Sequence, residues 1–209
     1  MGLYLNAKCK ICRRAGEKLL LRGERCNGPK CAIVKRNYPP GVHGQTSKRR
    51  LTPFGLQLKE KQKAKRTYGL RERQMKNYYL QSKKIKGDTA RTFLKYLEMR
   101  LDNVLYRLGF AKSRNQARQL ATHKHVTING RVNNRPSAQI KVNDTVAIKP
   151  SARENKIFQD MPVTLAKQET PLWLKLNAKD YSGQVIGEPT MEEMRQNFDI
   201  KVIVEFYSR

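Results

Sequence analysis

The feature that most constrains the fold is a change of hydrophobic period between residues 101 and 148. In its first part, apolar side chains recur at intervals of three and four, as on one face of a helix: Leu101, Val104, Leu105 and Leu108. Gly109 follows at the position of a left-handed C-cap. In its last part, residues 126–128 and 145–148 read as strands, and Asn129-Gly130 is a strong hairpin signal. This stretch is therefore predicted to form a small α/β module.

A second helix is predicted between these two parts. Ser113 can cap its first turn, and Gln116 is the reciprocal member of a capping box. Arg114 and Arg118 lie one turn apart on the outer face, where guanidinium groups suit phosphate oxygens. The side chains that turn inward are Ala117, Leu120 and Ala121. The alternative is a basic face that is merely solvated.

The net charge of +27 over 209 residues indicates the class of partner. Residues 1–100 hold 27 Lys and Arg against 6 Asp and Glu, whereas residues 151–209 hold 8 against 9. A charge placed so unevenly predicts a polyanion, either nucleic acid or an anionic membrane surface. The sequence has no apolar run of about 18 residues and no apolar signal-peptide core, so we expect a cytosolic protein that does not enter membranes.

Two basic helices are predicted between residues 48 and 79, interrupted by Gly69. Residues 35–86 carry 16 basic and 2 acidic side chains, whereas a solvated helix face normally interleaves both signs. This imbalance favours contact with phosphates. The predicted apolar anchors, in which the tyrosines are assigned to the core, are Leu56, Tyr68, Leu70, Met75, Tyr78, Tyr79 and Leu80.

The chain has four cysteines, Cys9, Cys12, Cys26 and Cys31, in the spacing C-x2-C-x13-C-x4-C. This spacing predicts one structural Zn²⁺ held by four thiolates, which leaves no open position for a catalytic water. Neighbouring Lys and Arg side chains favour the thiolate form. Disulfides, an iron–sulfur cluster and four unconnected thiols are the alternatives. A zinc knot would order a segment too short to bury a core of its own.

The remaining segments are read from shorter patterns. Asp88 or Thr89 is predicted to cap a helix that continues to Leu101. Residues 172–174 and 185–186 read as strands, and Pro189 to Glu193 begins a short helix with a capping box. The end of the chain, IKVIVEFYSR, is predicted to be a strand with one apolar face: Val202, Val204 and Phe206.

Three runs between Arg100 and Gly130, RLDNVLYRLGFA, SRNQARQL and HKHVTING, closely resemble the αL RNA-binding domain of the bacterial small-subunit ribosomal protein S4 family. The cysteine quartet, the segment YPPGVHGQ from Tyr38 to Gln45 and the C-terminal run resemble the same family. The likeness therefore covers most of the chain. The αL domain also occurs in some RNA-modifying enzymes, in a tyrosyl-tRNA synthetase appendage and in heat-shock RNA-binding proteins.

Together these observations predict an α+β fold. A mainly helical, basic N-terminal domain would carry the four-cysteine zinc knot, and a small αL-type α/β RNA-binding domain would contain a mixed sheet. The predicted divisions are 1–45 for the zinc knot and basic segment, 46–98 for the basic helices, and 99–161 for the αL domain. Residues 162–209 would complete the first domain with strands and a short helix.

The resemblance implies a structural rRNA-binding protein of the small ribosomal subunit in the cytoplasm. It implies early binding to the 5′ domain of the rRNA, neighbouring small-subunit proteins near the point where messenger RNA enters, and a role in accuracy. Messenger RNA is left open as a further partner. No phosphate loop, nucleophile elbow or H-E-x-x-H motif occurs, so no enzymatic activity is expected. A free RNA-binding regulator or RNA chaperone is the alternative, and a DNA-binding protein is a third.

The candidate zinc ligands are the four cysteines. The candidate RNA-binding residues are Arg13, Arg14, Lys35, Arg36, Tyr38, His43, Lys48, Arg49, Arg50, Lys63, Arg66, Arg71, Arg73, Lys76, Lys83, Lys84, Ser113, Arg114, Gln116, Arg118, His123, Lys124, His125, Asn129 and Arg131.

Overall fold

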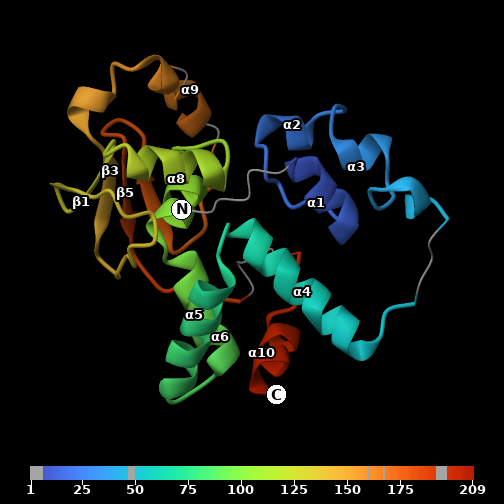
Figure 1. Cartoon of the computed structure of the whole chain (residues 1–209). Helices are drawn as coiled ribbons and strands as arrows, with labels where there is room; N and C mark the ends of the chain where they lie inside the picture. Colours follow the sequence, from blue (N-terminus) through green and yellow to red (C-terminus); the bar gives the residue numbers. More distant parts are fainter. Residues whose placement is uncertain (1–6, 47–49, 160, 167, 192–196) are drawn as a thin grey trace. The chain divides into compact units, whose positions relative to one another are not determined.

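The computed structural model describes residues 7–46, 50–159, 161–166, 168–191 and 197–209, and the chain divides into two compact units (Figure 1). Unit 1 comprises residues 1–93 together with 195–209, and unit 2 comprises residues 94–194. The fold class is α+β, as predicted, because unit 1 is helical and unit 2 combines helices with one sheet.

The N-terminal part of unit 1 consists of short helices: α1 (Lys8–Ala15), α2 (Glu24–Asn27), α3 (Ala32–Lys35) and the 3-10 turn η1 (Val42–Gly44). Its buried apolar cluster is small: Ile11, Cys12, Ala15, Leu19 and Leu21, with Ile33 packed against it. A cluster of this size stabilises little by itself, which agrees with the expectation that the segment needs a further source of order.

Two long helices, α4 (Pro53–Thr67) and α5 (Glu72–Lys84), form the rest of unit 1 together with α10 (Ile200–Ser208). The side chain of Thr52 caps α4 by accepting a hydrogen bond of 3.1 Å from the Gly55 amide, and Pro53 occupies the first turn. Among the predicted anchors, Leu56 and Leu80 are wrong, because they are 50% and 44% exposed. The other five are buried.

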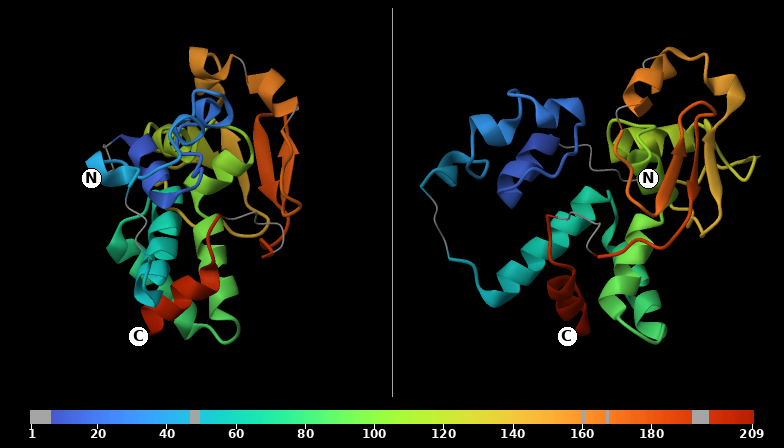
Figure 2. Two further views of the ribbon diagram at one scale, coloured as in Figure 1. Left: turned by 90° about the vertical axis from the view of Figure 1, so that its right-hand side faces the viewer. Right: turned by 180° about the vertical axis from the view of Figure 1, so that it is seen from behind.

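The C-terminal segment is a helix rather than the predicted strand. The chain IKVIVEFYSR carries apolar residues at the helical spacing as well as at a spacing of two, and Ile200 and Ile203 are the ones that become buried. Asp199 caps the helix by accepting a hydrogen bond of 2.8 Å from the Lys201 amide. Helix α10 packs against α4 and α5, and both views in Figure 2 show it, in red, alongside α4.

Helix α6 (Thr89–Glu98) leads into unit 2, where α7 (Leu101–Arg107) and α8 (Arg114–Thr122) follow. One continuous helix through Leu101 was the expectation, but the chain breaks after Glu98. There the Met99 carbonyl accepts from the Ile140 amide and the Leu101 amide donates to the Ala138 carbonyl. These bonds replace the intrahelical ones, so tertiary pairing ends α6.

The sheet of unit 2 contains β1 (Val126–Ile128), β2 (Arg131–Val132), β3 (Thr145–Ile148), β4 (Leu174–Asn177) and β5 (Ser182–Val185), in the order β2-β1-β3-β5-β4. Every pair is antiparallel, so the predicted mixed sheet is wrong. Short links explain two of these pairs, β1 with β2 and β4 with β5, since neighbouring strands joined by a tight turn must run in opposite directions. Asn129 and Gly130 form the predicted turn between β1 and β2, both at positive φ.

The predicted division at residue 161 also differs from the structure. Strands β4 and β5 were expected to complete the first domain, but β5 pairs with β3 and both lie in the sheet of unit 2. The predicted strands overlap them by one residue each: β4 shares only Leu174 with the predicted strand 172–174, and β5 shares only Val185 with the predicted strand 185–186. The helix predicted from Pro189 lies largely outside the described residues.

The core of unit 2 lies between α7, α8 and the sheet. The apolar stripe of α7 is fully buried, and so are Ala117, Val126, Val146, Ile148 and Val185. The 3-10 turns η2 (Pro150–Ala152) and η3 (Lys156–Phe158) and helix α9 (Met161–Ala166) add Ala152, Phe158 and Leu165 to this core. Within the described ranges, no helix is both long and apolar enough to cross a membrane.

Candidate nucleic-acid interface and metal site

The first turn of α8 is built by a capping arrangement close to the predicted one. Ser113 Oγ accepts a hydrogen bond of 3.3 Å from the Gln116 amide. Gln116 Oε1 in turn accepts a bond of 2.8 Å from the amide of Lys112 rather than from that of Ser113. Both side chains, predicted to contact RNA, are thus engaged in capping the helix. They fix the direction in which α8 presents its outer face.

Arg114 is held by two neighbours from α7. Its Nε donates a hydrogen bond of 2.8 Å to Asn103 Oδ1, and its guanidinium carbon lies 4.5 Å from the centre of the Tyr106 ring. Arg118, one turn later, is half-buried on the same helix. The inward side chains of α8 are buried, as predicted. This apolar face anchors the helix, and Arg114 is its first residue.

The residues after α8 bring two imidazoles together. His123 is exposed and His125 is half-buried, and their rings stack with centres 6.2 Å apart. Lys124 between them is exposed, at a positive φ of 62°. His125 also meets the ring of Phe158 edge-on, which ties this turn to the core.

Asn129 serves the sheet rather than projecting freely. Its Nδ2 donates 2.8 Å to Asp144 Oδ1, and its Oδ1 accepts 2.8 Å from the Thr145 amide. The predicted RNA contact of Asn129 therefore competes with two bonds that close the hairpin onto β3. Arg131, at the start of β2, is exposed.

Helices α4 and α5 and the residues just before each of them carry several of the predicted basic residues. The exposed ones are Arg50, Arg71, Arg73, Lys76, Lys83 and Lys84, while Arg66 is half-buried. Lys48 and Arg49 lie outside the described residues. Exposed cations on one unit, with few acidic neighbours in sequence, are what phosphate contact requires.

Lys63 corrects the predicted set. It is only 5% exposed, and its Nζ lies 2.7 Å from Glu17 Oε1 and 2.7 Å from Glu60 Oε1. Burial lowers the pKa of Lys63, but the hydrogen bonds to the two carboxylates outweigh this and raise it, so the side chain stays charged. Lys63 therefore connects α4 to the segment after α1 and is not available to RNA.

Arg13 and Tyr38 are engaged with each other. Arg13 Nε donates 2.9 Å to the Tyr38 carbonyl and Nη2 donates 3.2 Å to that of Pro39. The guanidinium carbon also lies 4.7 Å from the centre of the Tyr38 ring. This contact pins the segment after the cysteines to α1. The other predicted residues of this part are exposed: Arg14, Lys35, Arg36 and His43.

Some candidate residues were missed. Several exposed basic side chains share the character of the predicted ones: Lys10, Arg22, Arg25, Lys30, Lys86, Arg91, Lys112 and Arg135. Their charge is visible in the sequence, but Lys10, Arg25 and Arg91 lie in helices for which the sequence predicts no basic face, and the others lie in the links between elements. The buried carboxylate Glu98, which supports Asn103, carried no sequence signal.

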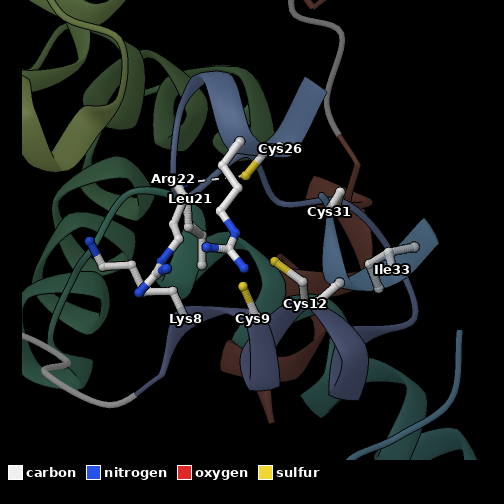
Figure 3. Close-up of a pocket in the computed structure, with 10 residues that line it drawn as sticks. Lys8, Cys9, Cys12, Leu21, Arg22, Cys26, Cys31 and Ile33 are labelled. Carbon is white, nitrogen blue, oxygen red and sulfur yellow. Dashed lines mark hydrogen bonds between the residues drawn. The ribbon is translucent and has the colours of Figure 1, made fainter. Parts of the chain in front are cut away.

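The four cysteines line one cavity of about 20 Å³ in unit 1 (Figure 3). Cys9 and Cys12 project from α1, Cys26 lies in α2, and Cys31 precedes α3. All four thiols are free, and Cys26 Sγ accepts a hydrogen bond of 3.3 Å from the Arg22 amide. As the side chains stand in the described part of the chain, no three Cys, His, Asp or Glu residues are arranged to hold a metal ion. The backbone nevertheless gathers all four thiols at one place.

The electrostatics of this cavity bear on what it can hold. Burial raises the pKa of Cys12, the nearby Cys26, Cys9 and Cys31 raise it further, and a hydrogen bond from the Leu19 backbone opposes the rise. Thiolates gathered in a buried place repel one another, and a soft dication relieves that repulsion. The cavity is also lined by Lys8, Arg22 and Arg25. The donor set therefore fits Zn²⁺ in number and chemistry.

Comparison with known proteins gives a family for the whole chain. Residues 4–98 match the ribosomal protein S4/S9 N-terminal domain, and residues 99–146 match the S4 domain. The chain is 44% identical to small ribosomal subunit protein uS4 of Syntrophomonas wolfei and of Heliobacterium modesticaldum, and 45% identical to that of Halothermothrix orenii. Each match spans 209 residues and the full length of both chains. The chain therefore belongs to the uS4 family of ribosomal proteins.

Proposed function

We propose that this chain is a structural rRNA-binding protein of the bacterial small ribosomal subunit, and not an enzyme. The observation that carries the proposal is the match, over the whole of both chains, to proteins named small ribosomal subunit protein uS4. The net charge of +27 and the exposed basic residues of both units support it, since rRNA offers phosphates to each of them.

The proposed mode of binding divides the work between the two units. Exposed cations on α5 would neutralise phosphates with little dependence on base sequence. The held guanidinium of Arg114 and the residues around the end of α8 would set the orientation of the S4 domain. Folded rRNA is recognised mainly through shape, phosphates and 2′-hydroxyls, which suits a surface of Arg, Lys and small polar groups.

The finer assignments rest on family membership. We propose early binding to the 5′ domain of the rRNA, a place among neighbouring small-subunit proteins near the point where messenger RNA enters, and a role in translational accuracy. Messenger RNA is a further candidate partner.

We also propose one structural Zn²⁺ on Cys9, Cys12, Cys26 and Cys31. Its support is that three short helices bring four free thiols to one cavity, with a backbone amide already donating to one sulfur. When bound, the ion would supply cross-linking rather than reactivity. The ion would then stabilise a segment whose own buried apolar cluster is small.

Fractionation of cell extracts tests the main proposal. Small subunits washed in high salt and quantified by mass spectrometry should contain one copy of this chain per subunit. A chain found only in the ribosome-free fraction would overturn the proposal, and would indicate a free RNA-binding regulator instead.

A further inference from the structure

Behind Arg114 lies a chain of buried polar groups that begins at Glu98. This side chain is 0% exposed. Arg107 donates to it twice, through Nε to Oε2 at 3.1 Å and through Nη2 to Oε1 at 2.9 Å. Asn103 Nδ2 donates to Oε2 at 2.6 Å. The carboxylate is thus charge-paired on one side and bound to an amide on the other.

The partners of Asn103 leave one orientation for its amide. Its Nδ2 donates both to the Glu98 carboxylate and, at 2.9 Å, to the Glu98 carbonyl. Both partners are acceptors, so the NH₂ group must face Glu98 and the oxygen must face away. That oxygen is the atom that accepts from Arg114 Nε at 2.8 Å. Glu98 therefore determines which end of the Asn103 amide reaches Arg114.

Arg114 is constrained from a second direction. The Tyr106 ring lies under its guanidinium, 4.5 Å away, while Asn103 holds Nε within the plane of the group. A planar group held at one edge and on one face has a defined direction for its terminal nitrogens, the donors that pair with phosphate oxygens. A long side chain normally loses rotamer freedom when it binds, and here much of that ordering precedes binding.

We propose that Glu98, Asn103 and Tyr106 are positioning residues that preorganise Arg114 for an RNA phosphate. This inference rests on the proposed rRNA-binding function. Glu98 acts through Asn103, Asn103 acts on Nε, and Tyr106 sets the plane of the guanidinium. Arg107 neutralises the buried carboxylate so that it does not attract Arg114 away from the RNA.

A double-mutant cycle on the full chain tests the proposal, with the affinity for small-subunit rRNA measured at one salt concentration. Asn103→Ala should weaken binding between about twofold and about tenfold, the range expected for ordering one long side chain on binding. In an Arg114→Ala background the same change should have no further effect, because no guanidinium remains to be positioned. Equal losses in both backgrounds would overturn the proposal.

The matched control pairs Asn103→Ala with Lys124→Asn. Lys124 is exposed, lies beyond the other end of α8 and has a positive φ that Asn tolerates. The two losses in affinity should add, since Lys124 makes its own contribution. Coupling as large as that with Arg114 would mean that Asn103→Ala disturbs the whole domain, which would also overturn the proposal.

A second cycle avoids the buried amide, in case Asn103→Ala fails to fold by circular dichroism. Tyr106→Leu removes the ring under Arg114, whereas Tyr106→Phe keeps it, and Tyr106 is only half-buried. Tyr106→Leu should weaken rRNA binding in the wild-type background but not in the Arg114→Ala background. Tyr106→Phe should leave rRNA binding unchanged in both backgrounds. A Leu effect that persists without Arg114 would contradict positioning. Absence of rRNA binding by the wild-type chain would instead refute the proposed function itself.

Discussion

The hydroxyl of Tyr207 in α10 donates a hydrogen bond of 2.7 Å to Glu72 Oε1 at the start of α5. The same carboxylate accepts bonds from Lys61 at 2.8 Å and from Lys65 at 3.0 Å, both in α4. One acidic side chain thus joins α4, α5 and α10, and the last helix is attached through a polar contact as well as through apolar packing. Burial and the bond to Glu72 together raise the pKa of Tyr207.

Removal of the Tyr207 hydroxyl should destabilise the chain. Tyr207→Phe keeps the ring, which stacks on Tyr79 with centres 5.2 Å apart, and deletes only the bond to Glu72. We expect a loss of about 1 kcal/mol in the free energy of unfolding, measured with urea. Ser208→Ala on the same helix is the control and should change it by less than about 0.5 kcal/mol, because Ser208 is exposed. No difference between the two variants would exclude a stabilising role for the hydroxyl.

Unit 1 should lose stability in acid through Glu72. Burial raises the pKa of this carboxyl, but hydrogen bonds from Lys61, Tyr207 and Lys65 outweigh burial and lower the pKa from 4.5 to about 2. A folded-state pKa below the unfolded one contributes stability that is present above 4.5 and is lost as the pH falls towards 2. Glu72→Gln should flatten the dependence of urea unfolding on pH in that window. An unchanged slope would show that other carboxylates cause it.

Gly183 in β5 should not tolerate a side chain. A Cβ there would lie 2.4 Å and 2.6 Å from the δ carbons of Leu108, which is fully buried in the core of unit 2. Gly183→Ala is expected to cost about 1–3 kcal/mol by overpacking, measured by thermal or urea unfolding. Gly187→Ala is the matched control, because its Cβ would meet Trp173 at an ordinary 4.0 Å. Equal stability of the two variants would mean that Leu108 moves aside without cost.

Metal analysis of the reduced protein, prepared anaerobically, should find one zinc per chain. The combined change Cys9→Ser and Cys12→Ser removes two of four thiolates and should abolish tight binding. Proteolysis should then cut the N-terminal segment faster while leaving unit 2 intact, because unit 2 has its own apolar core. Iron in place of zinc, or no metal in wild-type protein, would contradict the proposed site.

The helices and first strands of the S4 domain could be predicted because their signals are local. The stripe of α7, the cap at Ser113 and the Asn129-Gly130 turn each specify structure within a few residues, and the structure has all three. The C-terminal helix could not be predicted in this way. Its apolar residues fit the period of a helix as well as that of a strand. Packing against the rest of unit 1 favours the helix, as in the contact of Phe206 with Phe54, whose ring centres lie 5.6 Å apart.

The candidate site divides along the same line. Exposed basic residues such as Arg71 and Arg73 follow from charge alone. Lys63 has the same charge, but Glu17, which lies 46 positions earlier in the sequence, turns it inward. The burial of Glu98 likewise depends on Arg107 and Asn103 meeting it in space, since a glutamate at the end of a helix is ordinarily exposed. Charge predicts the kind of surface, and contacts that form only in the folded chain decide which charged residues belong to it.

The salt dependence of binding to small-subunit rRNA tests the central claim most directly. If about six to ten phosphates are neutralised, the logarithm of the affinity should fall against the logarithm of salt concentration with a slope of roughly −5 to −9. Arg114→Ala combined with Arg118→Ala should weaken binding and make that slope shallower. The melting temperature should fall only modestly, because Asn103 Oδ1 loses its bond to Arg114 while the buried face of α8 is untouched. An affinity and slope that the double change leaves unaltered would show that this face of α8 is only solvated. A slope near zero for the wild-type chain would contradict phosphate binding altogether.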